Sequence, residues 1–186
     1  MKNILEIIAG PNGSGKTTFA ESIFSARKNN FYVNADAIAA GLTLNGSKEA
    51  NFEAGRFMLR SINTAIQERK SLAFETTFSG RIWTHFLKRA KKNGFKIIIY
   101  FVFVKSIPLS LERIKQRVKK GGHDVPPSIV RRRFKKTFKN FWFNYKQYAD
   151  EWSIVDNSRE PVCIARLKNK KFQILNKFVF HKFFNP

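Results

Sequence analysis

The sequence has little of what marks a secreted or membrane-bound protein. A single cysteine, Cys163, occurs among 186 residues, so no disulfide can form within the chain and a reducing compartment is expected. No apolar stretch approaches the length that is needed to cross a bilayer. At the N-terminus, Met1-Lys2-Asn3 runs directly into an apolar segment without the pattern of a signal peptide. These absences predict a soluble, cytoplasmic protein.

Acidic residues are also scarce. The chain has 13 Asp and Glu against 35 Lys and Arg, which gives a formal net charge of +22. Between Arg81 and Lys146 only Glu112 and Asp124 are acidic, and no acid follows Glu160. Such a charge favours polyanionic partners, namely nucleic acid, a membrane surface or nucleotide substrates. It is equally compatible with a basic proteome in which surface lysines have no functional consequence.

One glycine-rich segment fits the phosphate-binding loop (P-loop) pattern G-x-x-x-x-G-K-[ST] at every fixed position. It follows an apolar run that fits a strand and precedes a segment that fits a helix. This context aims backbone N–H groups and a helix N-terminus at a phosphate, and it disfavours a chance glycine-rich turn. The predicted nucleotide-binding residues are Gly10, Asn12, Gly13, Ser14, Gly15, Lys16, Thr17 and Thr18. Lys16 would reach the β- and γ-phosphates, and the Thr17 hydroxyl would bind Mg²⁺.

Predicted strands alternate with predicted helices along the chain. The strands are Ile4–Ala9, Phe31–Val33, Leu72–Phe74, Lys96–Val104 and Trp152–Val155, and the helices are 17–24, 50–70, 81–93, one from Pro108, and one after Pro127 that runs to about Ala149. Lys96–Val104 is apolar on both faces, which is typical of a central strand. The predicted fold class is α/β, a three-layer P-loop NTPase sandwich with a mostly parallel central sheet and helices on both faces.

Polar residues are predicted at the carboxyl ends of further strands, where ligands bind in open parallel sheets. Asp36 follows the second strand and is a candidate base for an acceptor hydroxyl, or else an Asp that caps the next element. Glu75 is a candidate ligand of Mg²⁺ or substrate, or else half of an ion pair. Thr76 and Thr77 could add hydrogen bonds to substrate. Asp156-Asn157-Ser158 closes the last core strand.

Arginines flank a flexible connection. Arg113 and Arg117 are four residues apart, so they share a helical face, and Gly121-Gly122 follows. Arg131-Arg132-Arg133 begins the next helix. Arginines on both sides of a hinge suit a lid that closes guanidinium groups onto a transferring phosphoryl group. Each arginine alone is equally typical of a solvated surface. His123, in the hinge, could contact substrate or be an ordinary polar loop residue.

Taken together, several segments resemble the zeta toxin-like family of P-loop kinases, in its short stand-alone branch. They are the P-loop with Thr18, Asn34-Ala35-Asp36, Phe74 to Gly80, Arg117-Val118 with Gly121 to Pro126, Arg131 to Phe134, and Asp156-Asn157-Ser158. The likeness covers about residues 1–160. The Glu-Thr-Thr and Gly-Gly-His-x-Val-Pro segments are more specific than the P-loop.

The resemblance implies an ATP- or GTP-dependent kinase that phosphorylates the 3′-hydroxyl of UDP-N-acetylglucosamine or a related UDP-amino sugar, together with an antitoxin partner. It implies roles for Lys16 on the phosphates, Thr17 on Mg²⁺, Asp36 as the base and Glu75 on the substrate. Arg117 and one of residues 131–133, here Arg132, would stabilise the transferring charge.

Residues 1–160 are therefore expected to form a P-loop kinase domain, and residues 161–186 a basic, Phe-rich extension. Val162–Ala165 and Phe172–Leu175 suit a hairpin packed on the same domain, and no element is predicted for Phe178–Phe184. Three functions stay open: a small-molecule kinase, a nucleic-acid-directed P-loop kinase or NTPase favoured by the charge, and a nucleotide-dependent binding module without catalysis.

Overall fold

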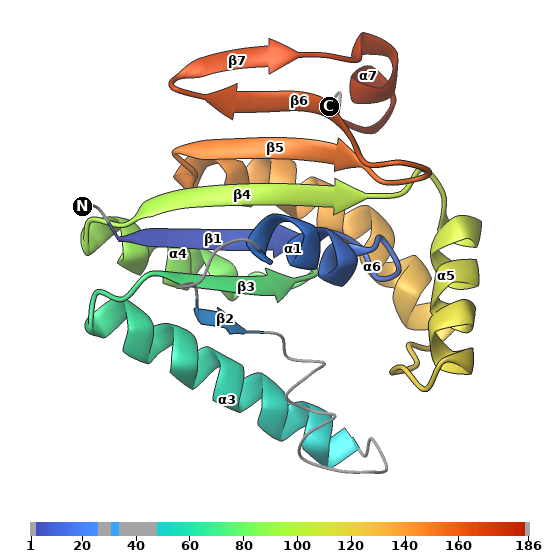
Figure 1. The fold of residues 1–186 in the computed structure, drawn as a ribbon, viewed down its shortest axis with the longest axis horizontal. Helices are drawn as coiled ribbons and strands as arrows, with labels where there is room; N and C mark the ends of the chain where they lie inside the picture. Colours follow the sequence, from blue (N-terminus) through green and yellow to red (C-terminus); the bar gives the residue numbers. More distant parts are fainter. Residues whose placement is uncertain (1–2, 26–30, 34–47, 185–186) are drawn as a thin grey trace.

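The computed structural model describes residues 3–25, 31–33 and 48–184 (Figure 1). All five predicted strands are present, and two more follow them. In chain order the elements are β1 (Ile4–Ala9), α1 (Lys16–Phe24), β2 (Phe31–Val33), α3 (Lys48–Gln67), β3 (Leu72–Thr76), α4 (Trp83–Lys92), β4 (Lys96–Phe103), α5 (Ile107–Lys119), α6 (Pro127–Asn140), a π-helical turn η1 (Phe141–Tyr145), a 3₁₀ turn η2 (Lys146–Tyr148), β5 (Glu151–Asp156), β6 (Val162–Lys168), β7 (Lys171–Ile174) and α7 (Lys177–Phe184).

The described strands form one seven-stranded sheet in the order β2-β3-β1-β4-β5-β6-β7. The strands from β1 to β5 are parallel to their neighbours, whereas β6 and β7 run antiparallel. β4 lies between β1 and β5, which confirms its predicted central position. Because β1, β3, β4 and β5 are parallel, the loops that follow them leave from the same edge of the sheet (Figure 1).

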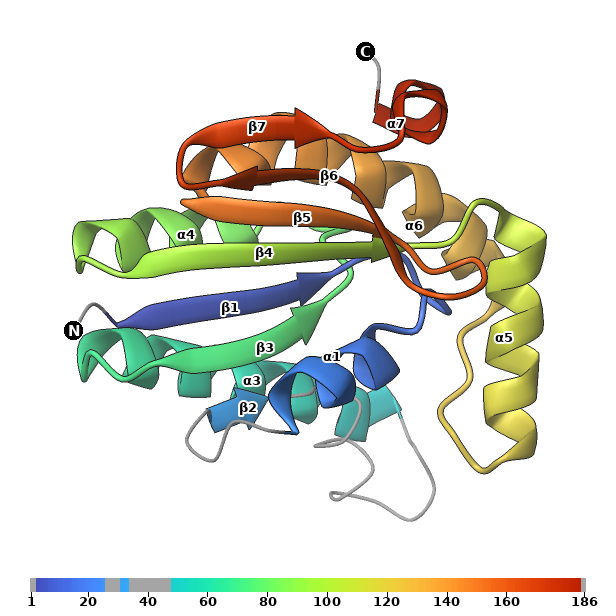
Figure 2. The ribbon, with the colours of Figure 1, turned by 45° about the horizontal axis from the view of Figure 1, so that its top comes forward.

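Helices cover both faces of the sheet unequally (Figure 2). Leu5, Ile7 and Ala9 point from β1 into a large core that also holds buried residues of α3, α4, α6 and α7. Ile8 points to the opposite face, where it packs with Ala20 of α1 in a smaller cluster. The period-two alternation of β1 therefore divides its apolar residues between two layers of helix, as a buried parallel strand requires.

The helix predicted to run to about Ala149 continues to Tyr148, but only its first part is an α-helix. The α-helix ends at Asn140, and the chain continues as a π turn and a 3₁₀ turn. Phe141 and Tyr145, at the two ends of the π turn, are both 0% exposed. Burying these two large rings compensates for the poorer hydrogen-bond geometry of the turn.

The last 25 described residues complete the sheet and its core. β6 and β7 form a hairpin, and β6 hydrogen-bonds to β5. The segment with no predicted element is helix α7, which buries Val179, Phe180 and Phe184 against the main core. α7 is eight residues long, and within the described ranges no helix is long and apolar enough to cross a membrane. The abundance of phenylalanine near the C-terminus thus has a structural use.

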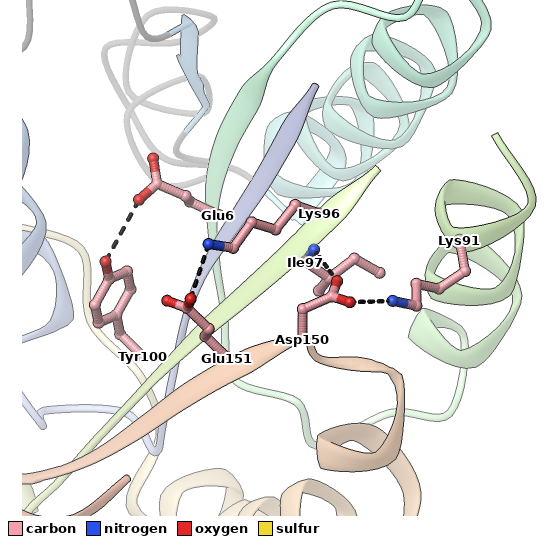
Figure 3. A network of polar contacts seen from close by, with 7 residues as sticks. All are labelled: Glu6, Lys91, Lys96, Ile97, Tyr100, Asp150 and Glu151. Atoms are coloured by element: carbon pink, nitrogen blue, oxygen red, sulfur yellow. Dashed lines mark hydrogen bonds and ion pairs between the residues drawn. The ribbon is translucent and has the colours of Figure 1, made fainter. Parts of the chain in front are cut away.

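A few acidic side chains tie β4 to its neighbours at the end remote from the P-loop (Figure 3). The contacts drawn there are Lys96 Nζ–Glu151 Oε1 at 2.8 Å, Lys91 Nζ–Asp150 Oδ1 at 2.6 Å and Tyr100 OH–Glu6 Oε1 at 3.4 Å. Asp150 also accepts a hydrogen bond of 2.7 Å from the backbone N–H of Ile97. Asp150 therefore joins α4, β4 and the start of β5.

Two phenylalanines of α7 test whether this helix contributes to the core. Phe184 is 3% exposed and contacts the rings of Phe101, Phe138 and Trp142, whereas Phe178 is 79% exposed. Phe184→Ala should lower the free energy of unfolding by about 3–4 kcal/mol because it leaves a cavity. Phe178→Ala, the matched control, should change it by less than about 0.5 kcal/mol. Urea unfolding followed by circular dichroism measures both, and equally small losses would contradict the packing of α7.

Candidate active site

The P-loop turns at the end of β1 with almost no space behind it. Gly13 and Gly15 have φ angles of 70° and 81°, in the left-handed region that favours glycine. A Cβ atom on Gly13 would lie 2.3 Å from the carbonyl oxygen of Ser110, and one on Gly10 would lie 1.8 Å from that of Val102. The loop backbone therefore packs directly against β4 and α5, and glycine is required at these positions.

Side chains from α5 and from the end of β5 hold the back of the P-loop. Ser110 donates a hydrogen bond from Oγ to the carbonyl oxygen of Asn12. Asn157 donates from Nδ2 to the carbonyl oxygen of Ser14 at 2.8 Å. Asn157 belongs to the strand-end cluster that the sequence predicts. Ser110 is not singled out by any pattern, because its role depends on where α5 packs.

Asp156 anchors the segment that carries Asn157. Its carboxylate contacts Lys105 Nζ at 2.7 Å and accepts hydrogen bonds from the Ser158 hydroxyl at 2.6 Å and the Ser158 backbone at 3.0 Å. Burial alone would raise the pKa of Asp156, but the hydrogen bonds from Lys105 and Ser158 outweigh it and hold the pKa below its usual value. Arg113 donates to the carbonyl oxygen of Ser158 at 3.3 Å. The cluster thus supports the P-loop from behind.

The interior of the P-loop fits a bound phosphate group. Ser14 is 0% exposed, and its hydroxyl has no hydrogen-bond partner within the described part of the chain. A buried hydroxyl without a partner is costly, and a phosphate oxygen would satisfy it. Lys16 holds its Nζ against the loop by donating to the carbonyl oxygen of Pro11 at 3.0 Å. α1 begins at Lys16, so its N-terminus opens onto the same loop.

The end of β3 meets the P-loop directly. The Thr17 hydroxyl donates to Glu75 Oε2 at 3.1 Å, and the Gly10 N–H donates to the carbonyl oxygen of Thr76 at 3.2 Å. β1 and β3 are neighbours, and Ile8 pairs with Glu75 in their register. A hydroxyl and a carboxylate side by side are oxygen ligands of the kind that Mg²⁺ prefers. This pair therefore fits the metal that the P-loop pattern predicts.

The loop after β3 is held in one conformation by its own hydroxyls. Thr76 and Thr77 accept hydrogen bonds from the backbone N–H groups of Phe78 and Ser79, at 3.2 and 3.4 Å. Phe78 is fully buried with a φ angle of 52°, which is unusual for a residue other than glycine. The two threonines that the sequence proposes for substrate binding thus shape the loop that follows Glu75.

A clamp from α6 and the π turn secures the same loop. Asn140 donates from Nδ2 to the carbonyl oxygen of Phe78 at 2.8 Å, and Tyr145 donates its hydroxyl to the carbonyl oxygen of Gly80. Burial raises the pKa of Tyr145 to about 12, so its hydroxyl keeps its proton. Sequence reasoning missed this clamp, because a π turn leaves no recognisable pattern in the sequence.

The Gly-Gly segment wraps around Arg117. Its guanidinium donates from Nη2 to the carbonyl oxygen of His123, and the Gly122 N–H donates to the Arg117 carbonyl oxygen at 3.0 Å. A Cβ on Gly122 would lie 2.5 Å from Arg117 Cγ, so glycine is needed there as well. The His123 side chain is exposed. The segment that the sequence interprets as a hinge thus positions Arg117 through its backbone.

The three arginines of α6 differ in burial. Arg131 and Arg132 are exposed, whereas Arg133 is half-buried. Arg133 lies four and seven residues before Thr137 and Asn140, so it shares the helix face that holds the loop after β3. The predicted base, Asp36, lies outside the described residues, three positions after the end of β2.

A family model, that of the zeta toxin, matches residues 2–168. The chain belongs to the zeta toxin family. The match includes the P-loop, the Glu75 segment and both groups of arginines, so the resemblance seen in the sequence is confirmed. Membership supports a P-loop kinase-type function for the chain.

Other comparisons agree with zeta toxin membership. An uncharacterized protein of Haemophilus influenzae is 31% identical over 134 residues, which are 72% of this chain and 94% of that protein. The solved AvrRxo1-ORF1:ORF2 complex has a chain with a TM-score of 0.77 at 18% identity, covering 100% of this chain and 64% of that one. A structure from the PezAT toxin–antitoxin system of Streptococcus pneumoniae has a TM-score of 0.67 at 13% identity, covering 100% of this chain and 80% of that one.

These structural likenesses show that the fold of this zeta toxin family member is that of the P-loop kinase-like proteins, as the sequence predicts. The chain spans 64% of the length of the matched chain in the AvrRxo1-ORF1:ORF2 complex. The P-loop and Glu75 therefore sit in the fold that the family shares.

Glycine substitutions test the P-loop geometry in this zeta toxin family member. Gly13→Ala should weaken ATP binding by at least about tenfold, because the added methyl group meets the Ser110 carbonyl and φ is positive. Gly55→Ala is the matched control, since Gly55 lies in α3 with no described atom within 4 Å of the added Cβ. It should leave binding unchanged and stabilise the fold by about 0.5–1 kcal/mol. Isothermal titration with ATP and thermal unfolding measure both, and unchanged binding in Gly13→Ala would contradict the geometry.

Proposed function

We propose that the chain transfers the γ-phosphate of ATP to a hydroxyl of a UDP-amino sugar such as UDP-N-acetylglucosamine. The observation that carries the proposal is the 3.1 Å contact between Thr17 of the P-loop and Glu75 at the end of β3. It joins the predicted nucleotide-binding residues to a second strand end, where an acceptor would lie in an open parallel sheet. The AvrRxo1-ORF1:ORF2 complex, one chain of which shares the fold, has been solved with ATP.

Lys16 and the backbone N–H groups of the P-loop bind the phosphates and orient the γ-phosphate toward Glu75. Phosphoryl transfer depends more on positioning the substrates and neutralising their charge than on covalent chemistry. A cation beside the phosphates neutralises that charge. Thr17 and Glu75 would hold Mg²⁺, which adds positive charge at the transferring phosphate. Asn157 and Ser110 keep the loop in shape while the substrates change.

On the acceptor side, Asp36 takes the proton of the attacking hydroxyl, as the family resemblance implies. Thr76 and Thr77 hold the loop that follows Glu75, and this loop forms part of the acceptor site with His123 contributing from the lid. Asp36 lies three residues after β2, which pairs with β3 up to Phe74, so its position in the chain suits this role.

Arginines neutralise the charge of the transferring group. Arg117 lies near the end of α5 and is held there by the Gly-Gly segment. For the second arginine the sequence names Arg132, but the face of α6 favours Arg133, which is half-buried and lies on the same side as Asn140. Arg132 is exposed on that helix. We therefore assign the second role to Arg133.

Alanine substitutions separate the two neighbours. Arg133→Ala should lower kcat by at least about a hundredfold, since it removes a cation that acts on the transferring phosphoryl group. Arg132→Ala removes the same charge from an exposed position and should leave kcat within about twofold. Steady-state kinetics on the identified acceptor measure both, with ATP binding as the check on folding. The reverse order of effects would return the role to Arg132.

The acceptor itself is identified by mass spectrometry. The protein is incubated with ATP, Mg²⁺ and a panel of UDP-sugars, together with an RNA oligonucleotide that has a 5′-hydroxyl. We expect an added phosphate on UDP-N-acetylglucosamine or a related UDP-amino sugar. Asp36→Asn should abolish this product while ATP binding stays nearly intact, because the base contributes to transfer and not to nucleotide affinity. Wild-type turnover in the variant would contradict the role of Asp36.

A nucleic-acid-directed kinase is the second candidate, favoured by the net charge of +22. The same panel decides between the two, because phosphate on the RNA end and none on any UDP-sugar would select it. We further propose that the protein acts in the cytoplasm, where ATP and UDP-sugars are present, using ATP in preference to GTP. An antitoxin is proposed as a protein partner, since the PezAT structure comes from a toxin–antitoxin system.

A further inference from the structure

A groove on the outer side of α6 has no role in the proposed reaction. It encloses about 660 Å³ between the start of α5, the helix α6 with its π turn, and α7. α5 and α6 are consecutive in the chain, whereas α7 comes from its C-terminal end (Figure 2). The apolar side chains that line it are Ile107, Pro108, Phe134, Phe138, Trp142, Phe143, Phe183 and Phe184.

Cations border the groove, and none of the described residues that line it is acidic. Arg131, Lys135 and Lys139 follow one another at intervals of four, so they form a line of about 12 Å along α6. Lys182 faces them from α7. All four are exposed and form no ion pair with any described acid, whereas Lys105, at the end of the groove, is paired with Asp156.

The groove is distinct from the candidate active site. Arg133 and Asn140, which serve the loop after β3, lie on a different face of α6 from Arg131 and Lys135. The two sites are nevertheless linked by α5. Its first turn lines the groove with Ile107 and Pro108 and supports the P-loop through Ser110. An occupant of the groove would therefore touch the helix that holds the nucleotide site.

We propose that this groove binds an acidic amphipathic helix of a partner protein. An apolar groove receives the apolar face of such a helix, with anchors at intervals of three and four residues. Acidic residues four apart on the partner would match the cations that are four apart on α6. The complementarity between these cations and an acidic helix is the reason for proposing this occupant.

The other occupants fit less well. A second copy of the chain carries a net charge of +22 and would be repelled by the cationic border. Single-stranded nucleic acid stacks successive bases on a series of exposed ring faces. Phe143 is 53% exposed, but Phe134, Phe138 and Phe184 are only 7%, 8% and 3% exposed, so the groove offers no such series. A membrane surface requires apolar groups that protrude, whereas these line a hollow.

A labelled peptide tests the proposal without reference to kinase activity. The probe is a fluorescein-labelled amphipathic helix with Leu and Phe at i, i+3, i+4 and i+7 and Glu at most other positions. Fluorescence anisotropy with the full chain should show saturable binding at one peptide per protein, which weakens as salt is added. The double variant Lys135→Glu/Lys139→Glu should weaken binding by about tenfold or more.

Matched controls separate the groove from the overall charge. Lys88→Glu/Lys92→Glu makes the same change of charge at exposed positions of α4 and should leave the affinity within about twofold. A peptide of the same composition in scrambled order should bind at least about tenfold more weakly, because it has no apolar face. Circular dichroism confirms that each variant is folded.

Three results would overturn the proposal. One is an absence of saturable peptide binding to the folded protein. Another is an equal loss of affinity in the α6 and α4 variants, or equal binding of the scrambled peptide, since either would show a non-specific charge effect. The third is tighter binding of an oligouridylate or of anionic lipid vesicles that depends on Lys135 and Lys139 while the peptide does not compete.

Discussion

The structure depends on a P-loop that is packed so closely that it leaves no room for side chains behind it. Cβ atoms at Gly10, Gly13 and Gly15 would lie 1.8 to 2.4 Å from Val102, Ser110 and Asn157, which come from β4, α5 and the end of β5. These neighbours fix the curvature of the loop, so the loop keeps its shape only where β4, α5 and the end of β5 pack against it. Because a phosphate is held by backbone N–H groups, this curvature decides whether the site can bind it.

Helix α6 connects the remaining parts of the site. One face holds the loop after β3 through Asn140, and the π turn at its end adds the Tyr145 hydroxyl to the same loop. Another face lines the apolar groove with Phe134 and Phe138. A single element thus serves the acceptor side of the candidate active site and a separate surface. The buried ring of Phe78, held against Tyr145, couples the loop to the core.

The scarcity of acids acquires a structural meaning in the fold. Asp150, Glu151 and Asp156 each contact a lysine and tie the edges of β4 and β5, while Glu75 faces the P-loop. With these acids committed to the framework, Arg131, Lys135, Lys139 and Lys182 form no ion pair with any described acid. These four cations border the apolar groove, so that surface can attract an acidic partner.

The sequence by itself determined the P-loop, the five parallel strands, the central position of β4 and the family, because these depend on local motifs and on the periodicity of apolar residues. The hairpin was also within reach, since its strands are short apolar runs. Only the tertiary structure decided that Ser110 and Asn157 hold the P-loop and that Asn140 and Tyr145 clamp the loop after β3. It also decided that Arg133 is half-buried while Arg132 is exposed. Such roles arise from contacts between residues that are far apart in the chain. These contacts depend on which face a helix turns toward its neighbours and on the π turn, and neither leaves a local pattern in the sequence.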